Sequence, residues 1–156
     1  MNKERLAMDN NYHRTADWLT ACGKVPSAEA ASTQIGCDIE EQVEFLECLM
    51  LGHDGNQTLL NEAIRGLKRV ATALKTGADV ATVGEGDRVN ALDALCDREV
   101  TGNGVAHLLG FNKPMADQAV LESNEAKLVD GEPIILEGGK IGKPDGWTAP
   151  DLSEFV

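Results

Sequence analysis

The sequence predicts an all-α protein, a bundle of four to five helices followed by a short C-terminal β-hairpin and an extended arm. Up to about residue 130 the chain is rich in Ala, Leu and Glu and aromatic residues make up only 4% of the sequence, a composition that favours helices. Apolar residues recur there with the 3.6-residue period of amphipathic helices. Beyond residue 130, glycine and proline become frequent. We therefore expect residues 1–130 to form the helical bundle and residues 131–156 to form the hairpin and arm of the same domain.

The bulk composition limits the classes of function. A chain of 156 residues with 42% hydrophobic and 26% charged residues is typical of one compact soluble domain. The net charge of −12 argues against a nucleic-acid surface, which needs a basic patch. No apolar run approaches the length of a membrane span, and no secretory signal is recognisable. The four cysteines form no C-x-x-C pair, so we expect reduced thiols in the cytoplasm of a bacterium or a phage-infected host.

Five helices are expected from the periodicity and from the residues that end each segment. Gly23 and Pro26 end the first, Gly52 and Gly55 end the second, and Pro114 opens the last. The expected ranges are 11–22, 30–51 (or 34–51), 57–75, 87–109 and 114–127. A hairpin is expected over residues 133–141, with a Gly-Gly turn.

Glutamates border the apolar face of the second expected helix. At 100° per residue, Ile39, Val43, Leu46 and Met50 share one stripe, and Glu40, Glu44 and Glu47 lie on the stripe beside it. Glu41 lies further round the helix. Carboxylates at a packing surface need a partner, because burying an unpaired charge is costly. The partner is either a divalent cation or a basic side chain from the next helix.

Acidic residues also border the apolar stripe of the fourth expected helix. Val89, Leu92, Cys96 and Val100 form that stripe, with Asn90, Asp93, Asp97 and Gly104 beside it. Carboxylates on two facing helices can hold two or more Mg²⁺ ions, which clamp a phosphoryl group and activate water. The structural alternative is that the aspartates pair with Arg65, Lys68 or Arg69 of the third helix.

Several other metal and phosphate sites are excluded by missing motifs. A ferritin-like di-iron centre needs Glu-x-x-His pairs, but Asn10, Met50 and Gly104 precede the three histidines by three residues. No EF-hand loop and no Walker-type phosphate loop occurs.

Six ordered motifs together resemble the all-α nucleoside triphosphate pyrophosphohydrolase superfamily (MazG-like), and most closely its phage-type phosphoribosyl-ATP-pyrophosphohydrolase-like branch. The first motif is Glu40-Glu41-x-x-Glu44, and the resemblance covers roughly residues 34–152. The other five are Leu92-Asp93-Ala94-Leu95-Cys96-Asp97, Gly104-Val105-Ala106, Ser123-Asn124-x-x-Lys127-x-x-Asp130-Gly131, Gly139-Lys140-x-x-Lys143-Pro144 and Pro150-Asp151-Leu152.

The resemblance implies cleavage of a nucleotide between its α- and β-phosphates, giving a monophosphate and pyrophosphate, with Mg²⁺ or Mn²⁺. It also implies a MazG-like bundle, a homodimer or homotetramer, and a purine deoxynucleotide such as dGTP as the substrate. The implied metal ligands are Glu40, Glu41, Glu44, Asp93 and Asp97, with Glu41 activating water. The implied substrate-binding residues are Asn90, Asn124, Lys127, Lys140, Lys143, Trp147 and Trp18, with His13 as a further candidate for stacking on the base.

The chain departs from the family in its second acidic motif, which is usually E-x-x-D. Asn90-x-x-Asp93 and Ala94-x-x-Asp97 stand in its place, so one glutamate is missing. Two alternatives therefore stay open: a non-enzymatic acidic protein that acts as a decoy or scaffold, and hydrolysis of phosphoribosyl-ATP itself.

Overall fold

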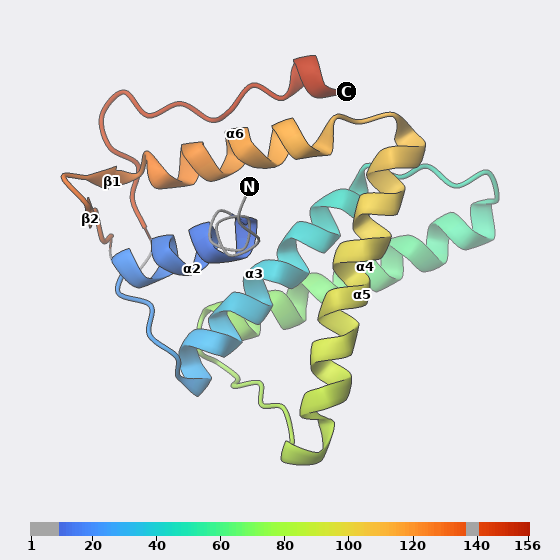
Figure 1. The fold of residues 1–156 in the computed structure, drawn as a ribbon. Coiled ribbons are helices and arrows are strands. Elements are labelled where there is room, and N and C mark those ends of the chain that lie inside the picture. Colours follow the sequence, from blue (N-terminus) through green and yellow to red (C-terminus); the bar gives the residue numbers. More distant parts are fainter. Residues whose placement is uncertain (1–9, 137–140) are drawn as a thin grey trace. The chain divides into compact units, whose positions relative to one another are not determined.

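The computed structural model describes residues 10–136 and 141–156, and these are mostly helical, as predicted (Figure 1). The α-helices are α2 (Asn11–Ala21), α3 (Ala28–Glu47), α4 (Asp54–Lys75), α5 (Arg88–Leu109) and α6 (Lys113–Glu125). The remaining elements are strands β1 (Leu128–Val129) and β2 (Glu132–Pro133) and the 3₁₀ turns η1 (Glu85–Asp87) and η3 (Ser153–Phe155). The five expected helices are confirmed. However, α3 ends at Glu47, before the expected end at residue 51, and Gly55, which was expected to end it, lies in the first turn of α4.

The chain divides into two compact units, each of which is described by itself. One unit is Pro26–Asp87, which contains α3 and α4. The other joins Met1–Val25 to Arg88–Val156, so α2 packs with helices that follow much later in the sequence. The predicted boundary at residue 130 stays a prediction.

Helices α3 and α4 pack closely because a glycine lies at their contact. Gly36 is buried, and a Cβ atom placed there would lie 2.8 Å from Lys75 Cγ and 2.9 Å from the Ala71 carbonyl oxygen. Val43 is 1% exposed at the same interface. On α4 the buried residues are Ile64, Ala71 and Leu74.

In the other unit, α6 contacts α2 and supports the C-terminal arm (Figure 1). The arm is attached at both ends of α6. Near the C-terminal end of the helix, Trp147 Nε1 donates to the carbonyl oxygen of Ser123 at 2.8 Å. At the N-terminal end, the backbone N–H of Asn112 donates to the carbonyl oxygen of Phe155 at 2.8 Å. The arm therefore runs back along α6 as an ordered part of this unit.

A two-residue turn follows α6 and joins β1 to β2. Asp130 and Gly131 both have positive φ, 54° and 84°, as the tight turns of two-residue hairpins require. The antiparallel register pairs Leu128 with Pro133 and Val129 with Glu132. The expected hairpin over 133–141 is represented by an antiparallel bridge between Ile135 and Ile141, and its Gly-Gly turn lies outside the described residues. The regular ladder thus begins earlier than predicted, at the Asp-Gly turn.

The predicted apolar stripe of α5 is not part of a core. Val89, Leu92 and Val100 are 79%, 63% and 68% exposed, and Cys96 is exposed as well. In this helix only Ala106 is buried. The expectation of a buried stripe was wrong because periodicity shows which residues share a face, whereas burial depends on what covers that face.

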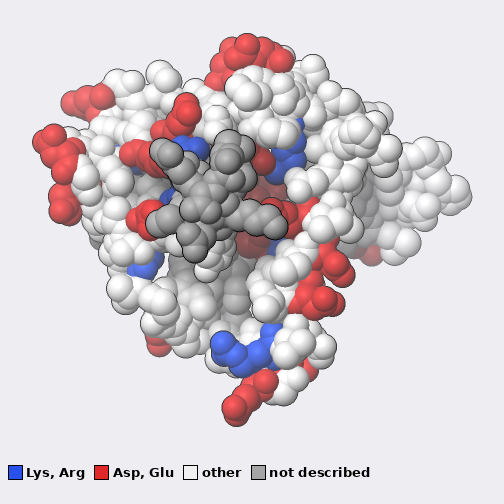
Figure 2. All heavy atoms as spheres, in the orientation of Figure 1, with Lys and Arg blue, Asp and Glu red and all other residues white. Residues whose placement is uncertain are grey.

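Acidic side chains are spread over several parts of the surface shown in Figure 2, in keeping with 26 acidic against 14 basic residues. No helix in the described part of the chain is both long and apolar enough to cross a membrane.

Candidate functional site

Two of the glutamates on α3 are paired with lysines of α4. Lys68 Nζ donates to Glu47 Oε1 at 2.6 Å, and Lys75 Nζ donates to Glu40 Oε2. The bond to Glu40 raises the pKa of Lys75. Glu40, a predicted metal ligand, thus has a basic side chain from the next helix as its partner. This arrangement was the second of the two alternatives left open by the sequence.

Glu41 and Glu44 lie one turn apart on α3 and have no ion pair among the described residues. Partial burial raises the pKa of Glu41, and repulsion from Glu44 and Glu40 raises it further. Burial is the larger of these two causes, and the neighbouring carboxylates of the same helix add to it. A cation bound there would relieve that repulsion.

The aspartates predicted to complete the metal site lie on the first half of α5. Asp93 and Asp97 are exposed, as is Asn90. Neither aspartate has an ion pair in the described ranges, whereas Lys68, one of their expected structural partners, is bound to Glu47. Because α3 and α5 belong to different units, the meeting of their carboxylates stays a prediction. Within the described residues no group of three or more His, Cys, Asp or Glu side chains could hold a metal ion.

Five of the predicted substrate-binding residues come together in the unit that contains α2 and α6. They are Trp18 from α2, Asn124 from the end of α6, Lys127 just after α6, and Lys143 and Trp147 from the arm. We call this group the Trp–Lys cluster. Lys140 lies outside the described residues, and Asn90 is on α5, apart from the contacts that define the cluster.

The ammonium group of Lys127 lies between two indole rings. Its Nζ is 5.3 Å from the ring centre of Trp147 and 6.0 Å from that of Trp18, distances at which cation–π attraction operates. It also donates to Asn124 Oδ1 at 2.7 Å. Burial lowers the pKa of Lys127, and the nearby Lys143 lowers it further.

Lys143 and Trp147 complete the cluster from the arm. Lys143 Nζ is 4.3 Å from the ring centre of Trp147, while the indole N–H of Trp147 is bound to the Ser123 carbonyl oxygen. Two ammonium groups therefore share one indole ring and repel each other, which is an arrangement suited to an anion. Stacking of Trp18, Trp147 or His13 on a base stays a prediction.

Two buried polar atoms next to the cluster find no partner in the described ranges: Trp18 Nε1 and Ser123 Oγ. Both can donate a hydrogen bond, and buried donors are seldom left unpaired in folded proteins. Both are therefore available to a bound molecule or a water.

An ion pair beside the cluster holds α2 on α6. Arg14 Nε donates to Glu125 Oε1 at 2.8 Å, and a terminal nitrogen of Arg14 donates to Oε2 at 2.9 Å. This pair lowers the pKa of Glu125. These two residues are 111 positions apart, and no sequence pattern predicted their contact.

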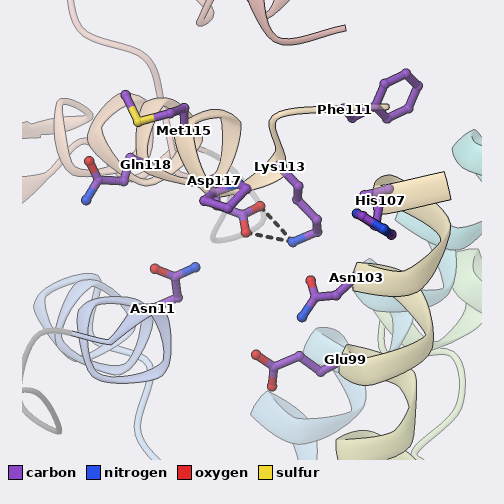
Figure 3. Close-up of a pocket in the computed structure, with 11 residues that line it drawn as sticks. Asn11, Glu99, Asn103, His107, Phe111, Lys113, Met115, Asp117 and Gln118 are labelled. Carbon is purple, nitrogen blue, oxygen red and sulfur yellow. Dashed lines mark hydrogen bonds and ion pairs between the residues drawn. The ribbon is translucent and has the colours of Figure 1, made fainter. Parts of the chain in front are cut away.

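A cavity of about 700 Å³ lies at the N-terminal ends of α2 and α6 and the C-terminal half of α5 (Figure 3). Its α5 wall carries Glu99, Asn103 and His107, spaced four residues apart and so on one face of the helix. Asn11 and the pair Lys113–Asp117 line it from α2 and α6. This cavity was not predicted from the sequence, although the four-residue spacing of polar residues on α5 was a signal for it.

The comparisons with known proteins name no relative of this chain. No protein-family model matches it, and neither a curated protein nor a solved structure matches it either.

Proposed function

We propose that this protein is a metal-dependent nucleotide pyrophosphohydrolase of MazG-like type, which cleaves a (deoxy)nucleoside triphosphate to a monophosphate and pyrophosphate. In this proposal the protein acts in the cytoplasm, and its favoured substrate is a purine deoxynucleotide such as dGTP. The Trp–Lys cluster carries the proposal. Residues that the motif resemblance assigns to the substrate come from α2, from the end of α6 and from the arm, and they share direct contacts.

In this proposal the Trp–Lys cluster binds the phosphates. Lys127 and Lys143 are the cations that neutralise them, because their mutual repulsion falls when an anion binds between them. Asn124 orients Lys127 through its hydrogen bond of 2.7 Å. The hydrogen bond from Trp147 to Ser123 holds the arm, and with it Lys143, at the Trp–Lys cluster. In this proposal substrate binding therefore depends on the position of the arm.

The acidic residues of α3 fit the Mg²⁺ or Mn²⁺ that the reaction needs. Glu41 and Glu44 supply the oxygen ligands that these ions prefer, and the repulsion that raises the pKa of Glu41 favours a cation there. Asp93 and Asp97 would add further ligands. A bound ion supplies neutralisation of phosphate charge and a more acidic water. In this proposal Glu41 also takes up a proton from the attacking water.

Glu40 has a different part in this scheme. Lys75 binds its Oε2, so Oε1 is the oxygen that remains for a metal ion. The pair also joins α3 to α4.

The oligomer is the remaining part of the proposal. Val89, Leu92 and Val100 expose an apolar face of α5, and a second copy of the chain would cover it in a homodimer or homotetramer. The apolar face and the aspartates lie on the same helix, so assembly would also fix the position of Asp93 and Asp97.

A non-enzymatic acidic protein is the second candidate, and one observation favours it. Glu40 and Glu47 are neutralised by lysines of α4, as in a purely structural network. In that case Glu41 and Glu44 would be surface charges without a bound metal.

The experiment that separates these candidates is pyrophosphate release from a panel of dNTPs, NTPs and phosphoribosyl-ATP with Mg²⁺ or Mn²⁺. The wild type is compared with Glu41→Gln and with Glu62→Gln, an exposed acid on α4 as the control. We expect the wild type to turn over a nucleotide with a monophosphate as co-product. Glu41→Gln should lose this turnover, and Glu62→Gln should keep it. Absence of turnover on every nucleotide would exclude the enzyme and leave the acidic protein.

A further inference from the structure

The cavity between α2, α5 and α6 is lined by exposed hydrogen-bonding side chains that have no partner among the described residues. In Figure 3, Asn11, Glu99 and Asn103 point toward the same open space, the first from α2 and the other two from α5. None of the three side chains has a hydrogen bond or an ion pair within the described part of the chain. A volume of about 700 Å³ falls within the range of small-molecule sites. The cavity thus combines adequate size with convergent polar groups.

The charges of the cavity exclude a phosphate. Its one lysine, Lys113, is bound to its neighbour on α6, with Nζ at 2.9 Å from Asp117 Oδ1 and 2.6 Å from Oδ2. Glu99 is a negative charge with no ion pair among residues 10–136 and 141–156. A phosphorylated group placed here would be repelled, in contrast to the Trp–Lys cluster, where two lysines are available.

We propose that this cavity binds an uncharged nucleoside and that the Glu99 carboxylate selects a guanine base. Guanine presents two adjacent N–H donors, at N1 and at the exocyclic amine, to the two oxygens of a carboxylate. Adenine presents one donor beside an acceptor, which the second oxygen repels. Asn11 and Asn103 each offer both a donor and an acceptor to the remaining edge of the base, and Ala106, Pro114 and Met115 supply apolar wall.

This inference is independent of phosphate hydrolysis. Glu99 is not among the residues proposed to bind metal, and the ligand has no phosphate to cleave. A protein without pyrophosphohydrolase activity can still bind guanosine here, and an active enzyme can fail to bind it.

The test is a titration of the full chain with guanosine, followed by ¹H–¹⁵N NMR and by isothermal titration calorimetry. Adenosine, inosine and guanosine monophosphate are titrated alongside. The variants are Glu99→Gln and Asn103→Ala, and the matched control is Glu122→Gln, an exposed glutamate of α6 outside the cavity.

We expect shifts in the amides of residues 99–107 and 113–118 and tighter binding of guanosine than of the other three ligands. Inosine lacks the exocyclic amine, so it should lose part of the affinity. Glu99→Gln should weaken guanosine binding about fivefold or more, the loss expected for a bidentate contact to a base edge. Asn103→Ala should also weaken it, and Glu122→Gln should leave it unchanged.

Three results would overturn the proposal. The first is a lack of guanosine binding at millimolar concentration. The second is equal affinity for adenosine, or unchanged affinity in Glu99→Gln. The third is a set of shifts confined to the indole signals of Trp18 and Trp147, which would place the ligand at the Trp–Lys cluster.

Discussion

Arg14 on α2 donates two hydrogen bonds, of 2.8 and 2.9 Å, to the carboxylate of Glu125 on α6, which lies 111 positions away in the sequence. The contact fixes the N-terminal helix beside the last turn of α6. That turn carries Asn124, and Lys127 follows it directly. Trp18 lies one turn beyond Arg14 on α2, so the same contact also brings Trp18 to Lys127.

The first prediction concerns this ion pair and its dependence on pH. Glu125→Gln should lower the free energy of unfolding by about 1 kcal/mol at pH 7, because the bidentate pair is partly exposed and screened. Arg14 lowers the pKa of Glu125, so the native state holds this proton less tightly than the unfolded chain does. The stabilisation is therefore present above the ordinary glutamate pKa of about 4.3 and lost as pH falls through the lowered value.

Urea unfolding followed by circular dichroism from pH 7 down to pH 3 measures this effect. The difference between the wild type and Glu125→Gln should shrink toward zero in acid, while Glu122→Gln, which removes an unpaired acid, should show no such trend. A difference that stays constant with pH would contradict the assignment.

The second prediction uses the two tryptophans, which are the only two in the sequence and both lie in the Trp–Lys cluster. Intrinsic fluorescence therefore reports on this cluster alone. Pyrophosphate should change the emission, because it competes with the indole rings for the ammonium groups of Lys127 and Lys143. Lys127→Met and Lys143→Met should each weaken the response about tenfold, and Lys68→Met on α4 should not. An unchanged response in both cluster variants would place the anion elsewhere.

The third prediction concerns the crowding of carboxylates on α3. Glu41→Gln should abolish turnover yet raise the free energy of unfolding of the metal-free protein slightly, by about 0.2–0.5 kcal/mol for each like-charge pair removed. The reason is that Glu44 and Glu40 repel Glu41. Thermal unfolding with a chelator, and again with Mn²⁺, measures both states. Mn²⁺ should stabilise the wild type and have a smaller effect on Glu41→Gln, and equal stabilisation of both proteins would argue against Glu41 as a ligand.

The fourth prediction concerns the contact of α3 with α4. Gly36→Ala should lower the free energy of unfolding by about 1–3 kcal/mol, because the added methyl group would lie 2.9 Å from the carbonyl oxygen of Ala71. Gly66→Ala on α4 is the matched control: nothing lies within 4 Å of its Cβ position. That variant should gain stability of up to about 1 kcal/mol from helix propensity. Chemical unfolding of the two variants side by side checks both signs.

The fifth prediction concerns the exposed face of α5. Leu92→Glu and Val100→Glu should shift the protein to a smaller oligomer, because each places a charge on an apolar face that a second copy would cover. Size-exclusion chromatography with light scattering gives the mass directly. Val25→Glu, an exposed apolar position outside α5, should leave the mass unchanged. A wild-type mass of one chain would refute the proposed oligomer.

The sequence alone determined where the helices lie. Periodicity and end signals such as Gly23 place α2 to α6 to within a few residues, because a helix is held together by contacts within its own segment. Sequence also placed Glu40, Glu41 and Glu44 on neighbouring stripes of one helix. The Asp-Gly turn, a known hairpin signal, was readable too, although the hairpin was expected later in the chain.

Only the tertiary structure decided which side chains are partners. Periodicity left open whether Glu40 meets a metal or a lysine, and it is the packing of α4 that brings Lys75 to it. Val89 and Leu92 are likewise exposed in the structure, although their apolar spacing predicted a buried face. Packing also brought Lys127, Lys143 and Trp18 together. A local pattern fixes the direction of a side chain on its own helix, whereas its partner depends on contacts between segments far apart in the sequence.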